Sequence, residues 1–207
     1  MRIALVLVAA CSTALAADED PVKAPYLEKG DCWTYRAQGL AYRPASHEYE
    51  YCITLIDTSK KLVLGIVTLK DDGREFDTVH TLEWTLHASH SGLISSDGFK
   101  PYKFPLKVGD SYSTKFEFKD TRYGQNAGEA RYDIKVVGWE DVTVPAGTFR
   151  ALKVEGSGSV RRYDQQLQFP HWFTAWYSPK VNRSVKLEYR NPGRSSSEEL
   201  TGYRLNQ

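Results

Sequence analysis

Several features that would point to a particular partner are missing from this sequence of 207 residues. Lys and Arg number 27 and Asp and Glu number 26, so the formal net charge is only +1. Without a basic excess we expect no nucleic acid as a partner. Beyond the N-terminus no run approaches the roughly 20 apolar residues that a membrane-spanning helix needs, so no transmembrane segment is expected.

Motifs of the common enzyme classes are also lacking. The sequence has no Gly-x-Ser-x-Gly elbow, no Walker loop, no His-Glu-x-x-His and no Cys-x-x-Cys. His87 and His90 form the one close histidine pair, but residues three apart on a strand point to opposite faces, and zinc would need further ligands. We therefore expect no enzyme, no metal and no cofactor.

The N-terminus has the pattern of a secretory signal peptide over residues 1–16. Arg2 supplies a positive start, an apolar stretch follows, and Ala14-Leu15-Ala16 is a small-x-small cleavage signal. We expect a periplasmic or secreted protein after cleavage near Ala16, with residues 17–26 as an N-terminal tail.

Cysteines are few, and the three present bear on both export and covalent structure. Cys11 ends the segment Val8-Ala9-Ala10-Cys11, which resembles a bacterial lipobox, so an outer-membrane lipoprotein anchored through Cys11 is the alternative. Cys32 and Cys52 remain as an even pair in an oxidising compartment, which predicts a disulfide between them. Two buried free thiols are the alternative for this pair.

Strand alternation runs along most of the chain, whereas helical periodicity is nearly absent. In residues 111–119 an apolar face alternates with a polar one, and residues 61–69 form an apolar run that predicts a strand covered on both faces. We expect an all-β fold of antiparallel, strongly curved sheet that forms an open barrel or a sandwich. The predicted buried faces comprise Tyr112, Thr114, Phe116 and Phe118; Ala130, Tyr132, Ile134 and Val136; Val185, Leu187 and Tyr189; and Tyr49, Tyr51, Ile53 and Leu55.

The two halves of the chain resemble each other weakly. Leu-x-x-Gly-Asp begins at Leu27 and again at Leu106, and each copy precedes an aromatic strand and a Tyr-rich strand. This self-similarity predicts two similar β meanders, over residues 27–98 and 99–207. The two Gly-Asp pairs are then turns that start each meander.

The segment from Val144 to Thr148, Val-Pro-Ala-Gly-Thr, predicts a tight hairpin and not a site of chemistry. Pro145 presets φ for the first central turn position. Gly147 can adopt positive φ and close a three-residue loop with a bulge. Pro145 and Gly147 are therefore interpreted as structural turn residues.

This hairpin, together with Trp176-Tyr177-Ser178-Pro179 and a closing Glu-Leu-x-x-Tyr from Glu199, resembles a group of exported bacterial proteins. The group is similar to the domain of unknown function numbered 3108. The resemblance covers mainly residues 106–205 and implies a curved antiparallel sheet in the cell envelope, like that of lipoprotein carriers. It implies no reaction and no catalytic residue. Asn182 departs from the pattern, since glycine is common at that place.

Aromatic residues make up 13% of the chain and are the remaining candidates for a functional role. A concave sheet face must be covered, and we expect a groove between the meanders, with Trp84, Phe116, Trp172 and Trp176 as ligand-binding candidates. The favoured function is an exported, non-enzymatic envelope protein that binds an apolar small molecule or lipid. A structural or assembly partner of another envelope protein is the alternative, and an enzyme of unknown class is the less favoured one.

Overall fold

The computed structural model describes residues 20–39, 45–89, 93–120, 125–163 and 165–206; the predicted signal peptide, with Cys11, lies outside these ranges. Twelve strands follow one another in antiparallel pairs, and a short 3-10 helix, η1, precedes β11. Among the described residues no helix is long and apolar enough to span a membrane. The elements are β1 (Cys32–Gln38), β2 (His47–Asp57), β3 (Leu62–Leu69), β4 (Glu75–Thr81), β5 (Leu86–Ala88), β6 (Leu93–Phe99), β7 (Ser111–Asp120), β8 (Gln125–Val144), β9 (Gly147–Arg162), β10 (Leu167–Ser178), η1 (Pro179–Val181), β11 (Arg183–Asn191) and β12 (Arg194–Arg204).

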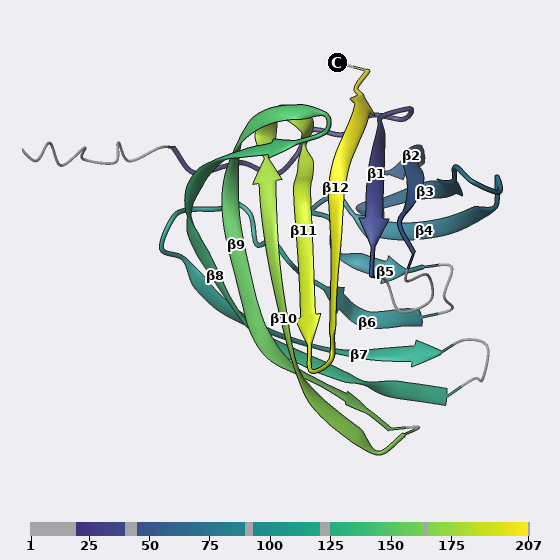
Figure 1. Ribbon diagram of the computed structural model, residues 1–207, viewed down its shortest axis with the longest axis vertical. Coiled ribbons are helices and arrows are strands. Elements are labelled where there is room, and N and C mark those ends of the chain that lie inside the picture. Colours follow the sequence, from purple (N-terminus) through teal and green to yellow (C-terminus); the bar gives the residue numbers. More distant parts are fainter. Residues whose placement is uncertain (1–19, 40–44, 90–92, 121–124, 164, 207) are drawn as a thin grey trace, which may run out of the picture.

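The strands form a single closed barrel. Each pairs with its neighbours in sequence, and β12 pairs with β1 to close the sheet. Strands β9 to β12 run along the long axis, whereas β4 to β7 run across it at a steep angle (Figure 1), as the twist of a strongly curved sheet requires. The prediction of an all-β, antiparallel, strongly curved sheet is confirmed.

Alternation places the core inside the barrel. Along β8, Ala130, Tyr132, Ile134 and Val136 are buried, as predicted, and residues between them are exposed. In β2 the predicted face fails at Leu55, whose exposed fraction is 51%. A register shift between Ile53 and Leu55 is the reason, because a bulge turns the following side chains to the other face.

The prediction that residues 61–69 are covered on both faces is wrong. Val63 and Leu69 are buried, but Leu64 and Ile66 are only half-buried. In a barrel one face of each strand points to the interior and the other points outward. Strand β3 therefore carries apolar side chains on both faces, but only its inner face is covered by the core.

The Val144–Gly147 turn is tighter than predicted. Val144 pairs directly with Gly147 across β8 and β9, which leaves a two-residue turn of Pro145 and Ala146 instead of a three-residue loop. Gly147 has φ +130°, so the positive φ expected there is present. The amide of Ala146 donates to the carbonyl of Leu200 at 3.0 Å, which attaches the turn to β12.

One core spans both predicted halves. Trp33 and Tyr51 come from the first and Tyr177 from the second, and all three are fully buried. Strands β1 to β6 end at Phe99 and β7 begins at Ser111, so the predicted boundary falls at the end of β6. The duplication itself stays a prediction.

Candidate functional site in the barrel interior

A cavity of about 660 Å³ lies within the barrel. Alternate residues of β2, β3, β4 and β11 supply most of its wall, because side chains two apart on a strand share a face. The lining is predominantly apolar and aromatic, with a few polar groups. It consists of Tyr49, Tyr51, Val67, Leu69, Phe76, Thr78, His80, Trp84, Leu86, Ser89, Phe99, Pro101, Tyr102, Arg183, Ser184, Leu187, Tyr189 and Glu198.

Arg183 is a cationic side chain in this wall. Its Cζ lies 4.2 Å from the ring centroids of both Tyr51 and Trp84, and 5.2 Å from that of Trp33. Aromatic faces attract a guanidinium at such distances. Its Nη1 is buried and has no hydrogen-bond partner. Aromatic rings thus hold the charge in place while one donor nitrogen remains unpaired.

The turn before β11 positions Arg183. Asn182 has φ 54°, in the left-handed region, which asparagine tolerates better than most residues. The indoles of Trp33 and Trp84 each donate a 2.7 Å hydrogen bond into the turn, to the carbonyls of Val181 and Asn182. The backbone on the N-terminal side of Arg183 is therefore fixed on two sides.

Tyr51 lies flat against β3 because residue 65 is glycine. A Cβ at Gly65 would come within 2.3 Å of the Tyr51 ring, so any larger residue would displace the ring. Tyr51 also contacts His80 edge-on, with centroids 5.5 Å apart. The Tyr51 hydroxyl and Nδ1 of His80 are both buried without a hydrogen-bond partner.

Burial also perturbs the ionisable groups of the wall. Burial, together with the charge of Arg183, lowers the pKa of His80 to about 3, so its imidazole is neutral at neutral pH. Burial raises the pKa of Glu198, and the hydrogen bond that it accepts from the Tyr49 hydroxyl acts in the opposite direction. The hydroxyls of Tyr102 and Ser184 are hydrogen-bonded to each other.

Of the four predicted ligand-binding aromatics, the structure places only Trp84 on this cavity. Phe116 faces inward but packs against Phe99 and Tyr132, with centroids 5.9 and 6.4 Å away. It belongs to filled core and not to the cavity wall.

Trp172 and Trp176 lie on the opposite face of β10, so their placement in an interior groove is wrong. Phe173 and Ala175 occupy the inward positions of that strand. Trp172 has an exposed fraction of 38% and lines two hollows beside β10. Trp176 donates to Glu140 at 2.9 Å and has Lys186 Nζ 5.2 Å from its ring centroid. The alternation in β10 cannot tell which face of the strand points to the core, because both faces carry bulky side chains.

The sequence did contain a signal for Arg183. The buried face predicted from Val185, Leu187 and Tyr189 reaches Arg183 when it is extended two residues back. Tyr51 was predicted to face inward, and it does. No local pattern marks Glu198, since Glu198 and Glu199 place carboxylates on both faces of β12. His80 alternates with Phe76 and Thr78, opposite Glu75 and Asp77, so the period of two residues could have indicated that it points inward.

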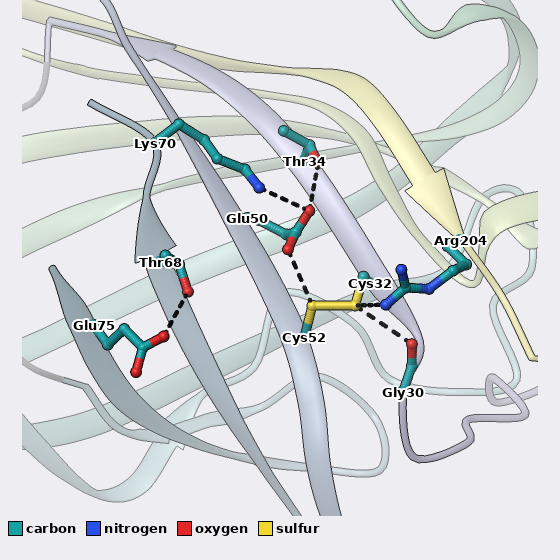
Figure 2. Close-up of polar contacts among 9 residues, drawn as sticks. All are labelled: Gly30, Cys32, Thr34, Glu50, Cys52, Thr68, Lys70, Glu75 and Arg204. Carbon is teal, nitrogen blue, oxygen red and sulfur yellow. Dashed lines mark hydrogen bonds and ion pairs between the residues drawn. A yellow bond between two sulfur atoms is a disulfide. The ribbon is translucent and has the colours of Figure 1, made fainter. Parts of the chain in front are cut away.

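The disulfide lies on the other face of β1 and β2 from the cavity. Cys32 and Cys52 are register partners with Cα atoms 4.2 Å apart, and they are bonded. Figure 2 shows Glu50 beside the bond, with an ion pair to Lys70 at 3.0 Å, and Nη2 of Arg204 3.1 Å from Cys32 Sγ. Cys32, Glu50 and Cys52 are close enough together to hold a metal ion, but bonded sulfurs are not thiolates and cannot serve as ligands. Of the predicted histidine pair, His90 lies outside the described residues.

Comparisons with solved structures show what the fold resembles. A candidate lipoprotein from Parabacteroides distasonis is similar with a TM-score of 0.60 and 15% identity, over 90% of this chain and 100% of that one. A candidate exported protein with a YmcC-like fold from Bacteroides fragilis has a TM-score of 0.56 and 14% identity, over 89% and 100%. The chain thus shares the fold of these proteins. No family model matches the sequence, and no curated protein matches it either.

Proposed function

We propose that this chain is an exported, non-enzymatic protein of the cell envelope that holds an apolar or amphipathic ligand inside its barrel. The observation that carries the proposal is the cavity of about 660 Å³ with a predominantly aromatic and aliphatic wall. Ligand sites in proteins are typically about 300–1,000 Å³, mostly apolar, with a few placed polar groups. The interior of this barrel meets each of these criteria.

Export is supported by three independent features. The N-terminal sequence has the pattern of a signal peptide, and the Cys32–Cys52 bond suits an oxidising compartment. The two proteins that share the fold are described as a candidate lipoprotein and a candidate exported protein. Cleavage near Ala16 is the favoured processing, and lipidation of Cys11 is the alternative.

Binding is favoured over catalysis by the hydrogen bonding in the cavity. A nucleophilic hydroxyl needs a base within hydrogen-bond reach. The Ser184 hydroxyl pairs with Tyr102 instead, and Nδ1 of His80 has no partner. The hydroxyl that does pair with a carboxylate, Tyr49 with Glu198, is a phenol whose pKa burial raises, which makes it a poor nucleophile. The polar groups of this wall are therefore better suited to hold a ligand than to activate a nucleophile.

Tryptophan fluorescence of the delipidated protein tests the proposal, because Trp84 lies in the wall. The protein is titrated with a fatty acid, a phospholipid and a short glycan. We expect a saturable response to an apolar ligand that is reduced in Trp84→Phe and retained in Trp172→Phe, with circular dichroism confirming that both variants fold. No response to any ligand, and no ligand-dependent rise in melting temperature, would overturn the proposal and favour the assembly partner.

A further inference from the structure

The unpaired polar atoms of this protein are concentrated in the cavity. Among the described residues, four buried side-chain nitrogen or oxygen atoms lack a hydrogen-bond partner. Three of them, on Tyr51, His80 and Arg183, belong to the cavity wall. Buried polar groups are nearly always paired in folded proteins, so three unpaired atoms in one wall require a cause. A polar group of a bound ligand supplies one.

Tyr51 is in contact with both of the other two side chains. The Tyr51 and His80 ring centroids are 5.5 Å apart, and Cζ of Arg183 is 4.2 Å from the Tyr51 centroid. Two of the unpaired atoms, the Arg183 nitrogen and the Tyr51 hydroxyl, can donate hydrogen bonds, and the His80 nitrogen donates in one of its two tautomers. Together they form a donor cluster at one place in a predominantly apolar wall.

The charge of the cluster is positive. A guanidinium stays protonated in proteins, and among the described residues Arg183 forms no ion pair. Glu198 is the carboxyl group of the wall. Burial raises its pKa, whereas the hydrogen bond that it accepts from Tyr49 and the charge of Arg183 act in the opposite direction. Its hydrogen-bond partner is Tyr49 and not Arg183, so the guanidinium remains free to pair with an anionic group of a ligand. Tyr49, Tyr102 and Tyr189 add no charge, because burial raises each of their pKa values.

The rest of the wall is predominantly apolar, and the volume that it encloses bears on the size of the ligand. Val67, Leu69, Phe76 and Leu187 supply apolar side chains of the same wall. A water-sized group takes about 30 Å³, so a cavity of about 660 Å³ accommodates about 20 non-hydrogen atoms. One acyl chain with its head group fits within this volume, whereas the second chain of a diacyl phospholipid would have to lie outside it.

We propose that the ligand is a single-chain amphiphile with an anionic head group, a carboxylate or a phosphate monoester. Arg183 and the Tyr51 hydroxyl bind the head group, and the chain lies along the apolar wall. A charge-assisted bidentate contact is the interaction for which a guanidinium is best suited. This inference rests on the proposed binding function and adds the chemical class of the ligand.

The test compares probes that share one alkyl chain and differ in the head group. Binding of dodecanoate, dodecyl phosphate, dodecanol and dodecylammonium to delipidated protein is measured by calorimetry below their micellar concentrations. We expect both anions to bind at least about 10-fold more tightly than dodecanol, since a hydrogen bond to a charged group has that effect. Dodecylammonium is expected to bind most weakly. The tighter of the two anions identifies whether the natural head group is a carboxylate or a phosphate.

Two variants test whether Arg183 and Tyr51 cause the preference for anionic head groups. Arg183→Gln should lower the affinity for the anions to about that for dodecanol, and Tyr51→Phe should weaken anion binding several-fold while keeping the ring. Arg190→Gln, the same change at an exposed position of β11, is the matched control and should leave every affinity unchanged. Circular dichroism and thermal melting establish that each variant is folded.

The remaining outcomes distinguish a failure of this inference from a failure of the proposed function. Equal affinity of wild-type protein for dodecanol and dodecanoate would overturn the inference while leaving the proposed function intact. Binding of no probe would overturn both. If Arg183→Gln does not fold, the wild-type comparison of head groups and the Tyr51→Phe variant still decide the matter.

Discussion

The guanidinium carbon of Arg183 lies over the indole of Trp84, 4.2 Å from the ring centroid. The Trp84 Nε1 donates to the carbonyl of Asn182, the residue just before Arg183. Trp84 itself has φ 63°, a conformation that is rare for a bulky residue and tends to occur at functional sites. One side chain therefore holds both the turn and the charged group that follows it.

Substitution of Trp84 should destabilise the protein more than substitution of an exposed tryptophan. Trp84→Phe removes the hydrogen bond to Asn182 and weakens the contact with Arg183, for an expected loss on the order of 2 kcal/mol. Trp172→Phe should cost less than about 0.5 kcal/mol. Urea denaturation followed by circular dichroism measures both. Equal losses would mean that Trp84 does not support the turn.

Removal of the disulfide should lower stability without changing the fold. The bond joins residues 20 apart, and a loop of that length corresponds to about 3 kcal/mol in the chain-entropy model. The Cys32→Ala/Cys52→Ala variant tests this by chemical denaturation. Alkylation of the denatured, unreduced protein followed by mass spectrometry should find neither thiol labelled, and labelling of both would contradict the bond.

Gly147 should matter for stability because of its backbone conformation. A Cβ at this position would meet only the Phe149 ring, at 3.9 Å, but φ is +130°, where β-branched residues are strained. We expect Gly147→Val to cost about 1–2 kcal/mol. Gly138→Val is the control, since that glycine has open space around it and no positive φ. A Gly147 variant with the stability of the parent but without ligand binding would contradict the structural interpretation of the hairpin.

His80 should make the protein acid-sensitive. Its pKa is about 3 in the folded state, whereas an unfolded histidine titrates near pH 6.5. The unfolded chain therefore binds more protons between these values, and stability falls as the pH drops from about 6.5 toward 3, by at most about 1.4 kcal/mol per pH unit.

His80→Phe removes this contribution and should flatten the loss of stability over the same pH range. Glu198 has a raised pKa and acts with the opposite sign, but it is present in both proteins and cancels in the comparison. Denaturant melts at several pH values between 4 and 7 measure the difference. Parallel pH profiles for the two proteins would show that His80 titrates alike in the folded and unfolded states.

The alternation of side chains was sufficient to predict an all-β, antiparallel sheet, because a period of two residues survives in β7 and in the middle of β8. It fails where the register shifts, as at Leu55, since a bulge depends on the partner strand. The alternation also does not identify the inward face of β10, because both faces of that strand carry bulky side chains. A groove was expected, but the lining of the cavity could not be predicted, because its wall combines β2, β3, β4 and β11, and only the closed barrel brings Tyr51 and His80 to Arg183.

Native mass spectrometry of the mature protein from its host's envelope tests most directly whether the interior holds a ligand. The wild-type protein should carry one small amphiphile, or take up one dodecanoate on incubation. Val67→Phe places a ring in the cavity opposite Tyr51 and should lose this ligand. Ile66→Phe, the same change on the outer face of β3, should retain it. A wild-type protein that carries and takes up nothing, or a Val67→Phe variant that binds as the wild type does, would contradict the account.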